Sequence, residues 1–139
     1  MKYSSLVKRI AGESSEVWNI HYEARKRFEI GEDVIMLSIG EESDETTPAA
    51  IQKEAITSIQ RGRHHYTPVA GEDHLRKAIA NRHHKLTGQQ VSIENICIFS
   101  GAQNALFSVC LCLLELGDEV IVPELFYATY PATVTAGGA

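Results

Sequence analysis

The sequence predicts an α/β fold, with a mainly parallel sheet and helices on both of its faces. Short apolar runs of the kind found in buried strands alternate along the chain with longer runs whose apolar residues have helical spacing. The stretch SGAQNAL, residues 100–106, joins a strand-like run directly to a helix-like run. The last two expected strands and the helix between them would form a right-handed βαβ unit.

The first half of the chain is expected to be mostly helical. Apolar and aromatic residues recur at helical spacing before Gly31, which is a natural helix stop. Thr47 is a good N-cap, and Pro48 suits the first helical position. The expected elements are a short helix or arm over 5–11, helices over 16–30 and 48–62, and a buried strand over 34–39.

The second half of the chain continues the alternation. Leu75, Ala78 and Ile79 lie on one face of a predicted helix that Gly88 closes. A long apolar run after residue 101 predicts a mostly buried helix that Gly117 ends. The expected elements are helices over 72–88 and 102–116, strands over 96–99 and 119–122, and a further helix beginning in FYATYPATVTAGGA.

Composition and charge argue against several classes of function. The chain has 139 residues, 44% of them hydrophobic and 22% charged, which is typical of one globular domain or part of one. Its net charge of −5 argues against a nucleic-acid partner. No apolar run is long enough for a membrane span, and the start has no signal-like apolar core. We therefore expect a cytoplasmic protein without a membrane partner.

Cysteines and histidines suggest no metal site. Cys97, Cys110 and Cys112 have no framework spacing and are predicted to be reduced thiols in a core. Residues two apart on a helix are separated by about 200° around its axis, so Cys110 and Cys112 cannot share a metal. His83 and His84 are expected on a solvated helix surface.

The loop SGAQNAL could hold an anion. A helix that begins near Ala102 leaves several backbone N–H groups unpaired, and its dipole favours negative charge there. Ser100 and Gln103 add side-chain donors. On these residues alone the signal is weak, because small residues before a helix are common, and a plain capping loop is the alternative. Because the chain has neither a G-x-G-x-x-G nor a Walker-type pattern, a bound phosphate is not expected to belong to ATP or NAD.

Four stretches in order resemble one enzyme family. YTPVAGEDHLRKAIANRHHKLTG, SGAQNAL, LLELGDEVIVPELFYATYP and MLSIGEESDETTP are similar to segments of the class I/II aminotransferases. These are fold-type I pyridoxal-phosphate enzymes of the aspartate aminotransferase superfamily. Within it, the stretch over residues 9–40 looks most like the start of arginine:pyruvate transaminases.

The resemblance implies an incomplete aspartate aminotransferase-like fold. Residues 1–47 would be the N-terminal arm, a helix and the first strand of the small domain. Residues 48–139 would begin the large cofactor-binding domain, which stops before its end. The family is homodimeric, so we expect a homodimer, with the arm at 1–15 crossing to the neighbouring subunit.

The resemblance also implies which residues hold pyridoxal 5′-phosphate. Gly101, Ala102 and Gln103 match the cradle of the 5′-phosphate. Tyr66 matches the tyrosine that reaches the phosphate in the neighbouring subunit, and otherwise it would be a tyrosine packed at a turn. Tyr127 matches the aromatic residue stacked on the pyridine ring, and otherwise it would be a core tyrosine.

Gly40 matches a glycine whose backbone lies beside the substrate carboxylate, where a Cβ would prevent close approach. It could also be a simple strand-end glycine. The loop after it departs from the family pattern by one extra residue and by added carboxylates. These could favour a cationic substrate such as arginine or could be a solvated surface. The added carboxylates are Glu41, Glu42, Asp44 and Glu45.

The family's remaining catalytic groups have no counterpart here. Transamination needs a lysine that bonds to the cofactor, a carboxylate for the pyridinium nitrogen and an arginine for the substrate carboxylate. We therefore predict no catalytic residue in this chain, and an inactive fragment of an enzyme of amino acid metabolism. The alternatives are a non-catalytic cofactor-binding module and an inactive truncated remnant, which an exposed apolar helix over 104–116 would mark. The lysines, none in a matching motif, are Lys2, Lys8, Lys26, Lys53, Lys77 and Lys85.

Overall fold

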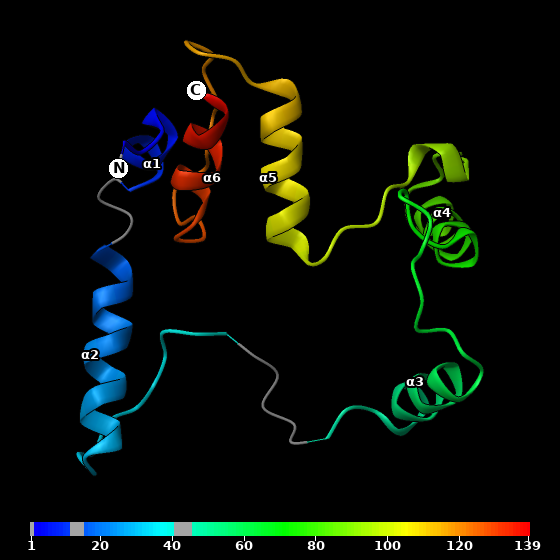
Figure 1. Cartoon of the computed structure of the whole chain (residues 1–139), viewed down its shortest axis with the longest axis horizontal. Helices are drawn as coiled ribbons and strands as arrows, with labels where there is room; N and C mark the ends of the chain where they lie inside the picture. The colour runs from blue at the N-terminus through cyan, green and yellow to red at the C-terminus, as the bar shows by residue number, and fades with distance from the viewer. Residues whose placement is uncertain (1, 12–15, 41–45) are drawn as a thin grey trace. The chain divides into compact units, whose positions relative to one another are not determined.

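The computed structural model describes residues 2–11, 16–40 and 46–139 (Figure 1). The chain forms two compact units. The first joins Met1–Glu41 to Gly101–Ala139, and the second is Glu42–Ser100. The domain boundary expected between residues 47 and 48 stays a prediction, because the units reflect contacts within this chain alone.

Helices account for the regular structure in both units. The first unit contains α1 (Ser5–Ile10), α2 (Val17–Glu29), α5 (Ala102–Leu113) and α6 (Tyr130–Gly137). The second unit contains α3 (Ala49–Gln60), α4 (Asp73–Thr87) and the short 3₁₀ helix η2 (Ile93–Asn95). Every run expected to be helical therefore contains a helix.

The N-cap of α3 and the C-terminal end of α5 differ from the expected ones. Pro48, not Thr47, is the N-cap of α3, and no side chain caps that helix. The longest discrepancy is in α5, which ends at Leu113 instead of continuing to Gly117. Leu114 turns extended, with φ −111° and ψ 136°, and the Asp118 carboxylate accepts the Glu115 N–H at 2.7 Å. This side-chain bond stabilises a turn where the apolar pattern alone predicted helix.

The strands predicted over 34–39, 96–99 and 119–122 are wrong, because no paired strand occurs among the residues that the structure describes. Ile96 does have extended backbone, with φ −117° and ψ 126°. However, an extended segment becomes a strand only when its N–H and C=O groups pair with a neighbouring strand. The Ile98 N–H donates to the Ala70 carbonyl at 3.0 Å, a single bond that builds no ladder.

Helix α6 packs against both α5 and α1 in the first unit (Figure 1). Cys110 of α5 and Ala136 of α6 are buried, with 7% and 3% of their surface exposed. Arg9 of α1 donates from Nε to the Thr135 carbonyl at 3.2 Å and from Nη2 to the Ala136 carbonyl at 3.4 Å. A cation is favourable at this end of a helix. Helix α1, which belongs to the arm expected over 1–15, thus contacts α6 of its own chain. That the arm crosses to a neighbouring subunit stays a prediction.

Gly137 allows α6 to approach α5 closely. A Cβ at this position would lie 2.8 Å from the Cys110 carbonyl oxygen and 2.9 Å from the Leu114 Cβ. We expect Gly137→Ala to lower the free energy of unfolding by about 1–3 kcal/mol, because the overpacked helices must separate. Thermal unfolding followed by circular dichroism measures this change. Gly40→Ala is the matched control, since nothing lies within 4 Å of its added Cβ, and an equal loss in both variants would contradict the explanation.

Arg76 joins α4 to the segment after it in the second unit. Its guanidinium donates from Nε to the Ile96 carbonyl at 2.9 Å and from Nη2 to the Ile93 carbonyl at 2.6 Å. Nη1 also bonds Asp73 Oδ1 at 3.2 Å. With only 8% of its surface exposed, Arg76 has its charge satisfied within the unit.

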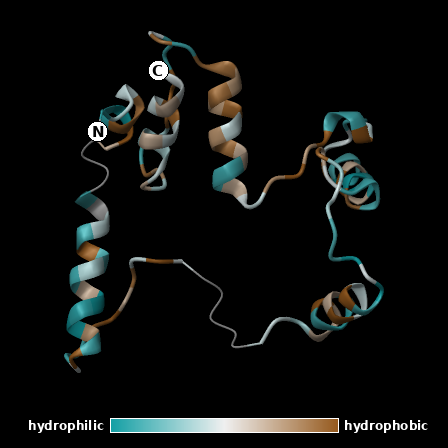
Figure 2. Ribbon diagram, in the orientation of Figure 1, coloured by the Kyte–Doolittle hydropathy of each residue, from teal (hydrophilic) through white to brown (hydrophobic). Residues whose placement is uncertain are grey.

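Apolar side chains remain exposed along α5. Figure 2 shows this helix as hydrophobic over most of its length after a more polar first turn. Phe107, Leu111 and Leu113 are 37%, 49% and 72% exposed. The expected burial of this helix was therefore wrong, as was the core location of Cys97 and Cys112, both exposed while Cys110 is buried. Within the described ranges, no helix has the length and apolar character to cross a membrane.

Candidate functional site

Gly101 begins α5 with a backbone conformation that almost only glycine adopts. It is the N-cap residue, with φ +86° and ψ 158°. Side chains with a Cβ are excluded from this region by steric repulsion. No side chain caps the helix, and nothing lies within 4 Å of where a Cβ would be. The turn before α5 therefore presents bare backbone.

The first amides of α5 are available to an anion. The first intrahelical bond runs from the Ala105 N–H to the Gly101 carbonyl at 3.2 Å. The N–H groups of Ala102, Gln103 and Asn104 have no acceptor among the described residues. They lie at the positive end of a 12-residue helix. This donor set suits a phosphate group.

The Gln103 side chain is bonded within the protein. Its Nε2 donates to the Thr129 hydroxyl, and its Oε1 accepts from the Thr133 hydroxyl at 3.4 Å. Only the backbone N–H of Gln103 is thus left for a ligand in the expected cradle. Thr129 and Thr133 were not predicted as site residues, although hydroxyls four residues apart at a helix start share one face.

Tyr127 lies just before α6 and is 55% exposed. Its ring meets the Tyr130 ring edge-on, with centroids 6.0 Å apart and planes at 61°. Tyr127 also lines a cavity of about 250 Å³ together with Trp18, Ile20, His21, Ser38 and Ala128. An exposed aromatic face beside a cavity is able to stack on a flat ring.

His21 is a second residue that sequence reasoning missed. It lies on α2, is only 9% exposed, and its Nδ1 is 2.8 Å from the Ser38 hydroxyl. This hydrogen bond joins α2 to the segment that ends at Gly40. No periodic signal could have paired residues from a helix and an irregular segment.

Tyr66 and Gly40 lie at exposed positions. Tyr66 belongs to the second unit and its side chain is completely exposed, at 106%. Gly40 is also exposed, and a Cβ there would meet nothing within 4 Å. The added carboxylates of the loop lie outside the described residues; they are Glu41, Glu42, Asp44 and Glu45. The roles expected for Tyr66 and Gly40 stay predictions.

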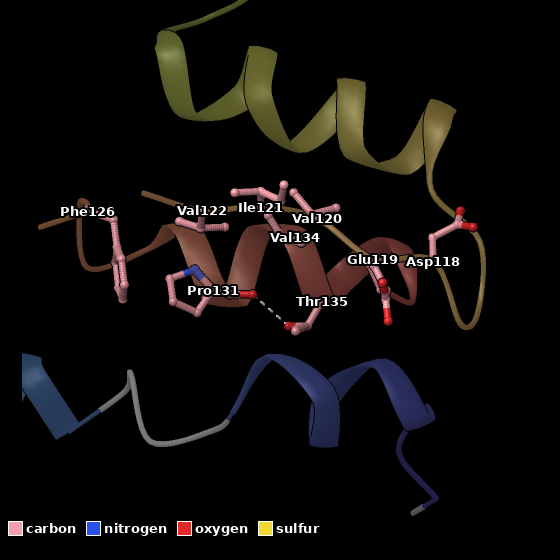
Figure 3. Close-up of a pocket in the computed structure, with 10 residues that line it drawn as sticks. Asp118, Glu119, Val120, Ile121, Val122, Phe126, Pro131, Val134 and Thr135 are labelled. Carbon is pink, nitrogen blue, oxygen red and sulfur yellow. Dashed lines mark hydrogen bonds between the residues drawn. The ribbon is translucent and has the colours of Figure 1, made fainter. Parts of the chain in front are cut away.

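A larger cavity of about 540 Å³ lies between the segment 118–122 and α6 (Figure 3). Its wall is mainly apolar, with Val120, Ile121 and Val122 along one side. Thr135, also in the wall, donates its hydroxyl to the Pro131 carbonyl at 2.8 Å. The cavity contains none of the expected site residues. Across the described part of the chain, no group of three or more His, Cys, Asp or Glu residues is arranged to hold a metal ion.

The family model for aminotransferase class I and II matches residues 32–139. The chain belongs to the class I and II aminotransferases. Relatives of known activity agree with this assignment. The chain is 47% identical, over all 139 residues, to arginine–pyruvate transaminase from Pseudomonas aeruginosa. It is also 40% identical over 99 residues to aspartate aminotransferase from Pyrococcus horikoshii, covering 71% of this chain and 25% of that enzyme.

Solved aminotransferase structures share the backbone path of this chain. Aspartate aminotransferase from Thermus thermophilus with maleate superposes with a TM-score of 0.87 at 30% identity. The superposition covers 99% of this chain and 35% of that one. The predicted fold class is therefore confirmed as an incomplete aspartate aminotransferase-like fold. The paired strands expected for its sheet do not form among the described residues. The chain spans about a third of the length of the Pseudomonas relative, 35%.

Class I and II aminotransferases depend on pyridoxal 5′-phosphate. The residues present here fit two parts of that cofactor. The uncapped amides after Gly101 fit the phosphate, and the exposed Tyr127 ring fits one face of the pyridine. Space around the Gly101 Cα leaves the approach to these amides open.

Proposed function

We propose that this chain is the N-terminal part of an aminotransferase that moves an amino group from arginine to pyruvate. One observation carries the proposal: 47% identity across all 139 residues to an arginine–pyruvate transaminase. More distant relatives are aspartate aminotransferases, at 40% identity or less. Arginine is therefore the donor that the comparisons favour, and a 2-oxo acid is the acceptor.

The residues of this chain would bind and orient the cofactor. The amides of Ala102 and Gln103 would hold the phosphate, together with the turn at Gly101. Tyr127 would fix the plane of the ring, and Tyr66 would bond the phosphate of a neighbouring subunit. When bound, pyridoxal phosphate supplies the electron sink for the reaction.

Gly40 would receive the substrate carboxylate beside its backbone N–H. The segment that carries Gly40 is joined to α2 by the His21–Ser38 hydrogen bond. We infer a homodimer in the cytoplasm for the whole enzyme, since the family shares its active sites between subunits. The role of Tyr66 depends on that dimer.

The chain alone is expected to produce no 2-oxo acid from arginine and pyruvate, even with added pyridoxal phosphate, because the lysine that bonds to the cofactor is missing. A chimera tests the proposed function directly. In it, this chain replaces the matching 35% of the Pseudomonas enzyme. We expect the chimera to transaminate arginine, measured by pyruvate-dependent formation of the 2-oxo acid.

The Pseudomonas enzyme itself is the positive control, and the chimera with Gly101→Ala is the negative one. A folded, dimeric chimera that prefers aspartate over arginine would contradict arginine as the donor. A folded chimera without any transamination would contradict the enzyme assignment of this chain.

An inactive remnant is a second candidate, favoured by the exposed apolar residues of α5. Val109 and Leu113 are 47% and 72% exposed, which is typical of a surface that lacks its packing partner. The chimera separates the two candidates, because it gives α5 the remainder of an aminotransferase to pack against. A remnant with damaged site residues would stay inactive there.

A further inference from the structure

We propose that Gln103 is a positioning residue that sets the distance between the phosphate-binding turn of α5 and the Tyr127 ring. The proposal rests on the proposed function, since both groups belong to the suggested cofactor site. In this positioning role, the Gln103 side chain contacts no cofactor atom. It acts by holding the start of α6 against the start of α5.

Two hydrogen bonds connect the two helices at this point. Gln103, at the second position of α5, donates to the hydroxyl of Thr129 and accepts from that of Thr133. Thr129 is the N-cap of α6, and Thr133 is one turn further along and only 7% exposed. The single proton of the Thr133 hydroxyl is shared between Gln103 Oε1 and the Thr129 carbonyl, which is closer at 2.8 Å. Both threonine hydroxyls thus lie within hydrogen-bond distance of one glutamine.

Tyr127 is connected to this network through the turn that precedes α6. The Tyr130 N–H donates to the Tyr127 carbonyl at 2.9 Å, which closes the turn containing Thr129. The two tyrosine rings also contact each other edge-on. A shift of Thr129 relative to α5 therefore moves Tyr127 relative to the amides that follow Gly101.

A ligand that carries both a phosphate and a ring is sensitive to this spacing. When the phosphate and the ring occupy their subsites at the same time, the ligand binds more tightly than either part alone. This gain in affinity exists only when the two subsites have the correct separation. Inorganic phosphate and pyridoxine each use one end, so their affinities do not depend on the separation. The three ligands together distinguish positioning from direct contact.

The experiment uses isothermal titration calorimetry on the 139-residue chain. The ligands are pyridoxine 5′-phosphate, inorganic phosphate and pyridoxine, which lack the aldehyde that reacts with lysines. We expect Gln103→Leu and Thr129→Val to weaken pyridoxine 5′-phosphate about tenfold or more. The dissociation constants of inorganic phosphate and of pyridoxine should change less than about twofold. Fluorescence of Trp18, the single tryptophan and a wall of the cavity beside Tyr127, gives a second readout.

Two further variants are matched controls. Thr129→Ser keeps the hydroxyl and should restore binding of pyridoxine 5′-phosphate to within about twofold of the parent chain. Thr87→Val removes a hydroxyl that donates to the His83 carbonyl in the second unit, and it should leave all three affinities unchanged. Circular dichroism checks that each variant keeps the helix content of the parent.

Each contrary outcome has its own meaning. Equal weakening of inorganic phosphate would make Gln103 a direct phosphate ligand and would overturn the positioning role. Unchanged binding of all three ligands in folded Gln103→Leu would also overturn it. If the parent chain binds inorganic phosphate but gains nothing from the linked ring, the cofactor site of the proposed function itself is contradicted.

Discussion

Replacing Arg76 by leucine is expected to lower the free energy of unfolding of the second unit by about 3 kcal/mol. The substitution removes the donors to the Ile93 and Ile96 carbonyls, bonds of 2.6 Å and 2.9 Å. Each hydrogen bond from a charged donor contributes about 1.5–3 kcal/mol, and an unpaired carbonyl adds a desolvation cost. Hydrogen exchange of the amides of α4 and of residues 93–98 measures the loss locally.

Two neighbouring variants serve as controls for Arg76→Leu. Asp73→Asn should cost less than about 1 kcal/mol, because the Asp73 side chain is 69% exposed and surface ion pairs contribute little. Lys77→Ala should be close to neutral, since Lys77 makes no ion pair within the described residues. If Arg76→Leu and Asp73→Asn reduced protection equally, the carbonyl bonds would not be the source of stability.

Replacing Gly101 by alanine is expected to weaken binding of inorganic phosphate at the start of α5 by about 5- to 150-fold. At φ +86° and ψ 158° a Cβ carries a strain of about 1–3 kcal/mol. The turn relieves this strain by rotating, which moves the amides of Ala102 and Gln103 away from a common point. A loss of 1.4 kcal/mol corresponds to a factor of ten in affinity. Calorimetric titration with phosphate measures it.

Gly88 provides the comparison for Gly101. It also has positive φ, at +76°, but its ψ of −11° lies in the left-handed helical region that asparagine tolerates. Gly88→Asn should therefore leave phosphate binding unchanged and cost little stability, whereas Gly101→Asn should behave like Gly101→Ala. Phosphate binding by Gly101→Asn as tight as that of the parent chain would contradict a requirement for this backbone conformation.

Helix positions were predictable because their signals are local. The Gly88 C-cap closes α4, and Gly101 precedes α5, as the sequence indicates. Strands were not predictable in the same way. Whether residues 96–99 or 119–122 form a ladder depends on partners elsewhere, and none lies in the parts of the chain described here. Burial of α5 likewise depends on what packs against it, and α6 covers only one side.

In the candidate site, too, the features with local signals were predictable and the contacts between distant segments were not. Gly101 and the amides after it follow from a strand-like run, small residues and a helix, all within one short stretch. The contact of Gln103 with Thr129 spans 26 residues and could not be read from either segment alone. The hydrogen bond between His21 and Ser38, which are 17 residues apart, was unpredictable for the same reason. Resemblance to the aminotransferases supplied the expected roles that spacing alone could not supply.

The contact of α1 with α6 has a consequence for biosynthesis. Arg9 and Thr135 are 126 residues apart, and the whole second unit lies between the two stretches that form the first. At ribosomal speeds of about 5–20 residues per second, α1 waits roughly 6–25 s for its partner helix to be made. The second unit can fold during this interval, while Val7 and Ile10 of the waiting arm are accessible to chaperones. Closure of the first unit then follows synthesis of the second unit, and it occurs after α6 has left the exit tunnel.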